Sequence, residues 1–234
     1  MTQASGKIFL ADQRGVEETA QFRRYSTLQF GAYCHEHKQA LGRLLAVNEE
    51  LVVGGARVTV AAAQAVHVLI IPITGAVQIG VEAEGPVQID VEEMYALTVP
   101  AGSTLHFTNP YDNALIDFLH LWIAADPAQS AAAGYVSQFS FAAIAGRLLP
   151  LLPPIGAPNA LPCTVSLGRF DGRQEVVYPL AGKAQFFAFV LAGAFEAEGR
   201  LLHEKDGLAL WDTKEVELEA LSNGALLVVV ELPA

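Results

Sequence analysis

Glycine- and proline-containing turns divide the chain into many short apolar segments, and this spacing limits the folds open to it. The segments are rich in Val, Ile, Leu and Phe, and none continues as a long amphipathic helix. They lie at 51–53, 66–73, 76–81, 95–99, 115–123, 163–167, 186–191 and 225–232. Many short strands at close spacing are typical of a sandwich or barrel rather than of alternating βαβ units. We therefore predict an all-β fold with a few short helices, near 16–21 and 139–145.

The middle of the chain carries a candidate domain boundary. The stretch AADPAQSAAA at 124–133 has small residues and no strand pattern, which favours a crossover. Both halves contain a strand, a glycine turn and a second strand, a pattern consistent with two diverged copies of one fold. We predict an N-terminal unit at 1–125, a crossover at 126–146 and a C-terminal unit at 147–234.

The charge balance disfavours several classes of partner. The formal net charge is −11, and the only tight basic pair is Arg23-Arg24, whereas nucleic-acid binding requires clustered Lys and Arg. We expect no nucleic-acid partner and no membrane association, since no apolar run reaches about 18 residues. The N-terminus has no signal-peptide pattern. Cys34 and Cys163 form no CxxC pair and are expected to be free thiols. These features predict a cytoplasmic protein.

Four stretches, in the same order along the chain, resemble the pirin family. STLQFGAY at 26–33 is similar to its aromatic-rich opening strand, and LLAVNEE at 44–50 resembles its LRVINED segment. FLHLWI at 118–123 resembles FLQIWI, and GRLLPL at 146–151 resembles the GKLRLIAS start of the second domain. The matches are collinear over nearly the whole chain. Because pirins are bicupins, the resemblance implies two tandem cupin-type β-barrels.

The resemblance also implies a metal site, from which this sequence departs. The family pattern supplies His-x-His, a Glu four residues later and a third His, a mixed donor set suited to Fe(II), Ni(II) or Mn(II). Here the two His positions fall on Ala61 and Ala63, and the Glu position falls on His67. The third His corresponds to His106. Two residues later, where the family has a carboxylate ligand, this sequence has Thr108. We expect no metal; if one binds, its ligands are His67 and His106.

These five positions form the predicted ligand pocket. If strand alternation holds, Ala61, Ala63 and His67 share one face, and His106 and Thr108 share another. Both imidazoles are then expected to point into the first barrel. One interpretation is a pocket that binds a small aromatic or carboxylate ligand. The other, which we favour for the two histidines, is that they are structural and hydrogen-bonded to backbone or Thr.

The remaining histidines have simpler interpretations. His120 lies in an apolar strand at the same parity as Trp122 and is predicted to be a partly buried ring near the indole. His35 and His37 lie in the polar stretch HEHK without a third ligand nearby, which favours a solvated loop. His203 is expected in a connection between two C-terminal strands.

The acidic residues suggest no catalytic pair. The pair Glu49-Glu50 is predicted to lie on a solvated face or in a strand with polar alternation. No GxSxG, GxGxxG or Walker loop occurs in the sequence. Nothing in the sequence therefore supports a hydrolase triad or a nucleotide-binding loop.

Three functional hypotheses remain. The first is a pirin-like bicupin without a complete metal site, acting by binding a small ligand or as a regulatory protein with a protein partner, and needing no cofactor. The second is a metal-dependent dioxygenase of the quercetinase type, which the resemblance implies for metal-bearing relatives, using Fe(II) or another divalent metal in an atypical site. The third is metal-independent acid–base chemistry by His67 or His106.

Overall fold

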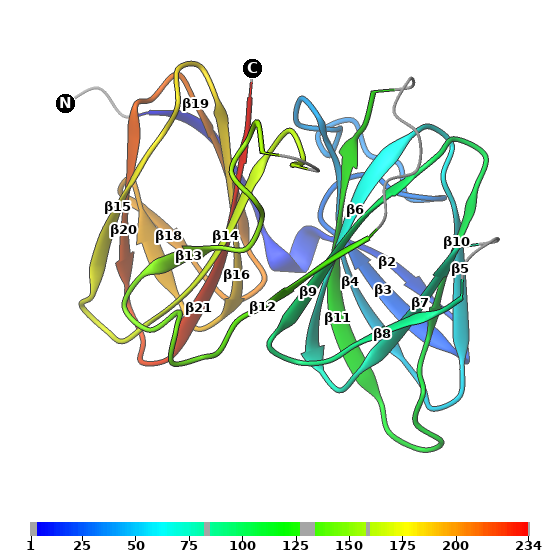
Figure 1. Ribbon diagram of the computed structural model, residues 1–234. Coiled ribbons are helices and arrows are strands. Elements are labelled where there is room, and N and C mark those ends of the chain that lie inside the picture. The colour runs from blue at the N-terminus through cyan, green and yellow to red at the C-terminus, as the bar shows by residue number, and fades with distance from the viewer. Residues whose placement is uncertain (1–3, 82–84, 127–133, 158–159, 234) are drawn as a thin grey trace. The chain divides into compact units, whose positions relative to one another are not determined.

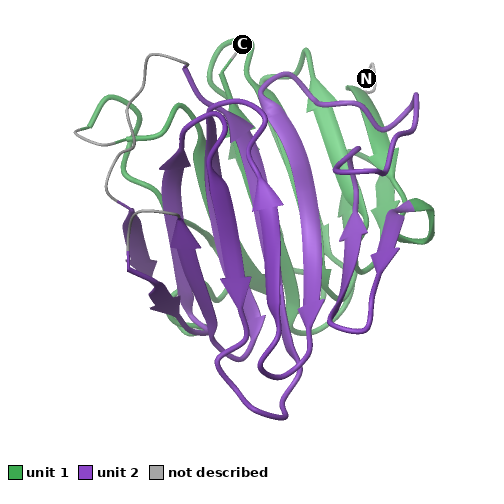
Figure 2. Ribbon diagram, turned by 90° about the vertical axis from the view of Figure 1, so that its right-hand side faces the viewer, with its two compact units in different colours: residues 1–13, 139–234 green, residues 14–138 purple. Residues whose placement is uncertain are grey.

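The structure is a computed structural model that describes residues 4–81, 85–126, 134–157 and 160–233. The chain forms two compact units (Figure 2). The N-terminal unit is Arg14–Gln138, and the C-terminal unit combines Met1–Gln13 with Phe139–Ala234. Nearly all regular structure in the described ranges is β-strand, as predicted. None of the described residues forms a helix with the length and hydropathy needed to span a bilayer.

Two antiparallel sheets build the N-terminal unit. Its strands are β2 (Gly15–Glu18), β3 (Phe22–Ser26), β4 (Leu44–Val52), β5 (Arg57–Ala61), β6 (Val66–Thr74), β7 (Val77–Val81), β8 (Val87–Ile89), β9 (Glu93–Val99), β10 (Thr104–Thr108), β11 (Ile116–Ala124) and β12 (Tyr135–Gln138). The seven-stranded sheet has the order β12-β9-β6-β11-β4-β3-β2, and the four-stranded sheet has the order β5-β10-β7-β8. Figure 1 shows β4, β6 and β11 side by side, with β5, β7 and β10 in the other layer.

A hydrophobic core fills the space between these two sheets. Strand alternation directs Val58 and Val60 inward from β5, Phe107 from β10, and Phe118 and Trp122 from β11. The strand β6 is buried along both faces, which explains its uninterrupted apolar sequence. Side chains therefore fill the interior between the two sheets of this unit.

The C-terminal unit repeats this two-sheet plan. Its strands are β1 (Ser5–Phe9), β13 (Leu148–Pro150), β14 (Thr164–Phe170), β15 (Glu175–Pro179), β16 (Gln185–Ala192), β17 (Phe195–Ala197), β18 (Arg200–Leu202), β19 (Gly207–Trp211), β20 (Glu215–Ala220) and β21 (Ala225–Leu232). The six-stranded sheet has the order β1-β19-β16-β21-β14-β13, and the four-stranded sheet has the order β15-β20-β17-β18. Buried Phe, Leu and Val side chains from both sheets form its core.

The unit boundaries differ from those predicted. The expected N-terminal unit began at residue 1, but β1 pairs in register with β19 and belongs to the C-terminal unit. The N-terminal unit continues past residue 125 to Gln138, because β12 pairs with β9. Part of the expected crossover, 127–133, lies outside the described residues.

The two predicted helical turns are absent from their expected places. Residues 16–21 form β2 and the turn into β3, because these strands pair as a hairpin from Gly15 to Ser26. Residues 139–145 form a series of turns. Among the described residues, the helical element is a three-residue 3-10 turn, η1 (Ala11–Gln13).

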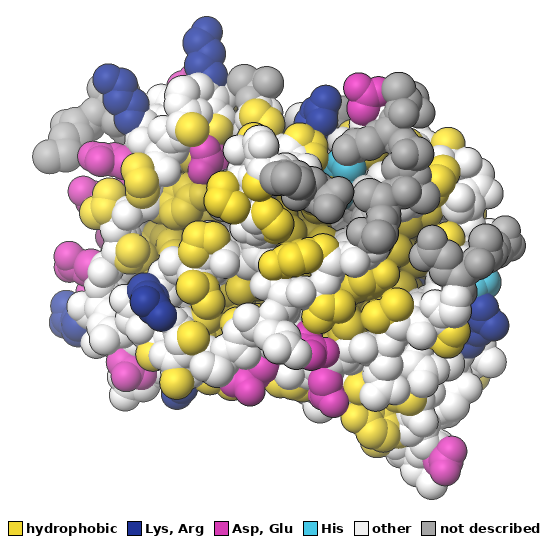
Figure 3. Space-filling model, in the orientation of Figure 1, with side chains coloured by type: hydrophobic (Ala, Val, Ile, Leu, Met, Phe, Trp, Pro, Cys, Tyr) yellow, Lys and Arg dark blue, Asp and Glu magenta, His cyan; other side chains and the backbone are white. Residues whose placement is uncertain are grey.

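Basic side chains are dispersed on the face drawn in Figure 3. The Lys and Arg side chains there lie singly among apolar and acidic ones. The expectation that nucleic acid is not a partner remains a prediction.

Candidate functional site

The N-terminal unit contains an open pocket of about 720 Å³. Its lining comes from the edges of both sheets. One side is β5, the edge strand of the four-stranded sheet, and the other side includes β2 and β3, at the edge of the seven-stranded sheet. The segment between β3 and β4 supplies a further wall. The residues that line it are Glu17, Arg24, Gln29, Phe30, Gly31, Ala32, Tyr33, Cys34, Ala40, Leu45, Thr59, Val60, Ala61, Ala63, Gln64, Val66 and Trp122.

Arg24 is the buried cation of this pocket. It shares the inward face of β3 with Phe22 and is only 5% exposed. Its Nε donates to Glu50 Oε1, and its Nη1 donates to Glu17 Oε2 at 2.8 Å. Its Nη2 is buried and has no hydrogen-bond partner among the described residues. A buried guanidinium nitrogen without an acceptor is energetically costly, so this atom is suited to an incoming acceptor.

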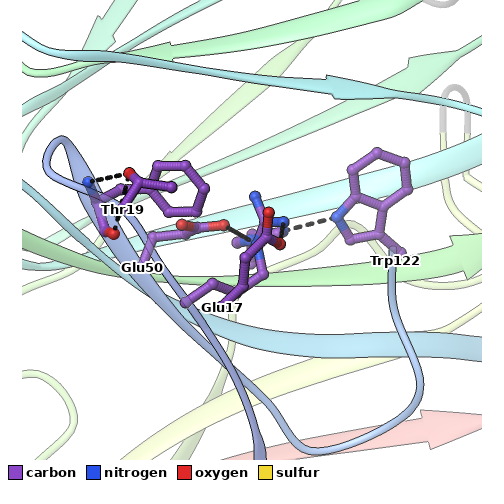
Figure 4. Close-up of polar contacts among 7 residues, drawn as sticks. Glu17, Thr19, Glu50 and Trp122 are labelled. Carbon is purple, nitrogen blue, oxygen red and sulfur yellow. Dashed lines mark hydrogen bonds and ion pairs between the residues drawn. The ribbon is translucent and has the colours of Figure 1, made fainter. Parts of the chain in front are cut away.

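Behind Arg24, Glu50 begins a hydrogen-bonded chain to Trp122. Glu50 is fully buried on β4, and its Oε1 lies 3.1 Å from His120 Nε2. The Trp122 indole donates to His120 Nδ1 at 2.6 Å. Figure 4 shows Glu17, Glu50 and Trp122 directed toward this shared cluster.

The hydrogen bonds from Glu50 to Trp122 determine the tautomer of His120. The Trp122 indole is only a donor, so His120 Nδ1 must accept and the ring proton must lie on Nε2, which donates to Glu50. Burial lowers the pKa of His120, although the carboxylate of Glu50 acts in the opposite direction. We therefore assign His120 as a neutral ring that orients Glu50 and Trp122.

Aromatic rings enclose the charged group. The Phe30 ring centroid lies 5.3 Å from that of Trp122 and 5.9 Å from that of His120. The Arg24 guanidinium lies 5.1 Å from the Phe30 centroid. Tyr33 packs directly on Gly15, where any Cβ would overlap its ring. The pocket therefore combines flat apolar walls with one buried cation.

The five predicted pocket residues are not brought together. Ala61 and Ala63 line the pocket, whereas His67, His106 and Thr108 are absent from its lining. The prediction that both imidazoles point into the barrel is wrong. Each lies on the strand face opposite the core: Val66 and Val68 face inward on β6, and Leu105 and Phe107 face inward on β10.

Each displaced histidine has a threonine partner. His67 is buried, and its Nδ1 lies 2.9 Å from Thr98 Oγ1. Burial is the main cause that lowers the pKa of His67, with a further contribution from Arg43. His106 Nδ1 lies 3.1 Å from Thr59 Oγ1 on the outer face of the four-stranded sheet. Both contacts agree with the structural interpretation favoured from the sequence.

The other histidine predictions agree with the structure. His35 and His37 are exposed in the segment between β3 and β4, and His203 lies in the turn between β18 and β19. His120 is close to Trp122 as expected, but it is fully rather than partly buried.

The prediction of a solvated face for Glu49-Glu50 is wrong. Both side chains are buried, and each pairs with an arginine distant in sequence. Glu50 pairs with Arg24, and Glu49 lies 2.7 Å from Arg14. These ion pairs compensate the cost of removing the carboxylates from water.

The residues at the pocket do not fit the metal that the fold family implies. Alanine supplies no donor atom at Ala61 or Ala63, and the inward residues of β10 are the apolar Leu105 and Phe107. Across the described ranges, no three His, Cys, Asp or Glu side chains are placed to hold a metal ion. Glu50 and His120 are already engaged with each other and with Arg24 and Trp122.

The sequence analysis does not identify Arg24 or Glu17 as site residues, and Arg24 stands out there only as half of a basic pair. One signal was available: in the strand at 22–26, alternation places Arg24 on the same face as Phe22, an apolar residue. A charge on the apolar face of a strand indicates a buried partner or a ligand.

The comparisons with known proteins agree with this fold. Residues 163–232 match a pirin C-terminal model described as the quercetinase C-terminal cupin domain. No match is found among the curated proteins. The structure is similar to Escherichia coli YhhW, with 16% identity, a TM-score of 0.85 and 98% of each chain covered. Another structure of YhhW is described as a complex with nickel(II).

Two further structures share the architecture. Escherichia coli YhaK has 20% identity and a TM-score of 0.74, with 90% of this chain and 94% of that chain covered. A quercetin 2,3-dioxygenase from Acinetobacter baumannii has 12% identity and a TM-score of 0.72, with 97% of this chain and 78% of that chain covered. Two tandem two-sheet units of this kind define a bicupin. The C-terminal part, residues 163–232, thus matches a pirin C-terminal cupin domain, and the whole chain has the fold of the pirin-like structures to which it is similar.

The neutral state of His120 predicts a pH-dependent stability. Because its pKa is lowered on folding, the unfolded chain binds more protons below about pH 6.5, and stability falls as the pH decreases. The maximum slope for one such histidine is about 1.4 kcal/mol per pH unit. We expect His120→Gln, which has no titrating ring, to flatten the fall in Tm between about pH 7.5 and 5.5. An unchanged slope in this variant would contradict the assignment.

Proposed function

We propose that the protein binds a small aromatic molecule in the pocket of its N-terminal unit and acts as a binding or regulatory protein. The observation that carries this proposal is the pocket itself, about 720 Å³ in volume and walled by Phe30, Tyr33 and Trp122. Ligand sites are typically concave, apolar and supplied with few polar groups, and Arg24 is such a group.

The small residues of β5 and the following turn support this proposal. Ala61 and Ala63 line the pocket where the family pattern has two imidazoles. Shorter side chains leave more room for an organic ligand at the rim. The same two positions remove the donors on which a quercetinase-type dioxygenase would depend.

Metal loading separates binding from this alternative activity. After incubation with Fe(II), Ni(II) or Mn(II) and desalting, we expect well below one metal per chain by plasma mass spectrometry. Near-stoichiometric metal would favour an unconventional site that does not combine His67 with His106, because these residues face outward from different sheets. The dioxygenase alternative would then be tested by oxygen-dependent turnover.

The cytoplasm is the proposed location. Its support is the sequence pattern described above together with the two cysteines, which are both free. Burial raises the pKa of Cys163 to about 12, so this thiol is unreactive at neutral pH.

Ligand binding can be measured at the pocket wall itself. Trp122 and Trp211 are the two tryptophans of the chain, so Trp211→Phe leaves Trp122 as the single indole reporter. We expect 2-naphthamide and benzamide to bind by titration calorimetry and to change the fluorescence of Trp122. Ala63→Phe should lower the affinity at least about tenfold by filling the rim, an effect typical of overpacking a fitted site.

The matched control is Thr108→Phe, on the outer face of the neighbouring strand β10. Its affinity for both amides should remain within about twofold of the unmodified chain, since Thr108 is paired with Arg57 and neither residue lines the pocket. If neither the amides nor the corresponding carboxylates bind at millimolar concentration, the proposed binding function is wrong.

A further inference from the structure

The pairing of Arg24 points to the chemical class of the ligand. Resting on the proposed binding function, we infer that the ligand is an aromatic carboxylate whose carboxylate replaces Glu17 on Arg24. Glu17 would then be an internal substitute for the ligand, displaced into solvent when the ligand binds.

The hydrogen bonds of Arg24 leave one edge incompletely used. Nε is engaged by Glu50, whereas the edge formed by Nη1 and Nη2 receives a single acceptor oxygen, Glu17 Oε2 on Nη1. Nη2 is buried and has no partner among the described residues, and the second carboxylate oxygen of Glu50, Oε2, is likewise buried without one. A planar guanidinium edge matches a carboxylate that accepts from both nitrogens at once. A ligand carboxylate on this edge would therefore satisfy the atom that Glu17 leaves unpaired.

The two glutamates differ in how readily they can leave. The Glu50 side chain is 0% exposed and also accepts from His120. The Glu17 side chain is 48% exposed, on the edge strand β2. Releasing Glu17 returns a half-exposed carboxylate to water, whereas releasing Glu50 would break up a fully buried pair, so Glu17 is the partner that is less costly to displace. Only Glu17 is therefore an exchangeable partner.

The local charge requires exchange rather than addition. Arg24 carries one positive charge, and Glu17 and Glu50 carry two negative charges around it. His120 is neutral, as derived above. A ligand anion added to this group would be repelled by Glu17, whereas a ligand that replaces Glu17 leaves the charge balance unchanged.

The aromatic walls define the rest of the ligand. Phe30 lies against both the guanidinium of Arg24 and the indole of Trp122. A carboxylate bound at Arg24 therefore has apolar ring faces directly beside it, which suit a ring attached to the carboxyl group. The inferred class is a planar aromatic carboxylate of one or two rings.

The test compares acids with their neutral amides in three proteins. Titration calorimetry is carried out with benzoate, benzamide, 2-naphthoate and 2-naphthamide on the unmodified chain, Glu17→Gln and Glu18→Gln. We expect Glu17→Gln to tighten 2-naphthoate binding about three- to tenfold, because the competing carboxylate is removed, with less than about twofold change for 2-naphthamide. Glu18→Gln is the matched control: Glu18 is adjacent and exposed but pairs with Arg23.

Arg24→Gln should weaken 2-naphthoate at least about tenfold more than 2-naphthamide. If that variant fails to fold, the comparison of Glu17→Gln with Glu18→Gln still decides. Equal affinities for acid and amide, with no selective gain in Glu17→Gln, would overturn the carboxylate inference and leave the binding function intact. Equal gains in both glutamine variants would reveal a general charge effect and would also overturn it. No binding of any compound overturns both.

Discussion

Replacing Arg24 with Met is expected to destabilise the N-terminal unit by about 3–5 kcal/mol, because it leaves the buried Glu50 without its cation. His120 cannot compensate at neutral pH, since its ring is held neutral between Glu50 and Trp122. For a chain of this size the loss corresponds to a fall of about 6–20 °C in the Tm of this unit. Calorimetry or urea denaturation measures it.

The adjacent residue provides the control. Arg23 pairs with Glu18 on the surface, and its side chain is 44% exposed. Arg23→Met should therefore cost less than about 1 kcal/mol. The double variant Arg24→Met, Glu50→Leu should recover most of the stability lost in the single variant, since it removes both buried charges. Equal effects of Arg23→Met and Arg24→Met would show that the buried network does not stabilise the unit.

Phe107→Ala is expected to cost about 3–5 kcal/mol, the usual range for removing a fully buried phenyl ring. Phe107 is 0% exposed, and its ring lies 5.0 Å from that of Phe118 and 5.1 Å from that of His120. The cavity left by the ring would therefore border the charged network as well as the apolar core. Denaturant unfolding with unchanged m value measures the loss.

His106→Ala is the matched control for this variant. His106 lies one residue earlier, on the outer face of β10, where its partner is Thr59. Its replacement should cost less than about 1 kcal/mol. A larger loss for His106→Ala than for Phe107→Ala would mean that the inward face of β10 is the one predicted from the sequence.

The fold was predictable because its signals are local. Short apolar segments bounded by turns correspond to strands in both units, and the resemblance to pirins led to the bicupin arrangement. The helical prediction near 16–21 failed because the residues of β2 are determined by pairing with β3 rather than by their own propensity. Similarly, the pairing of β1 with β19 has no local signal.

The site was less predictable, because the local sequence does not always show which face of a strand points inward and does not show which distant residues pair with each other. In β10 the apolar residues Leu105 and Phe107 alternate, and this pattern already indicates that His106 faces outward. In β6 both faces are buried, so no alternation reveals the direction of His67. The burial of Glu50 depends on Arg24, 26 positions away, and could not be inferred from either segment alone.

The pairing of β1 with β19 makes the order of synthesis important. During translation the first strand of the C-terminal unit is made before the whole N-terminal unit, and its partner strand is made only near the end. The continuous segment 14–138 can complete its own sheets first, whereas the sheet of the C-terminal unit closes last and with a high contact order. Until β19 is made, β1 has no partner strand, an arrangement that invites strand exchange between chains. Deleting residues 5–9 would leave the edge of β19 permanently open and promote association of the C-terminal unit.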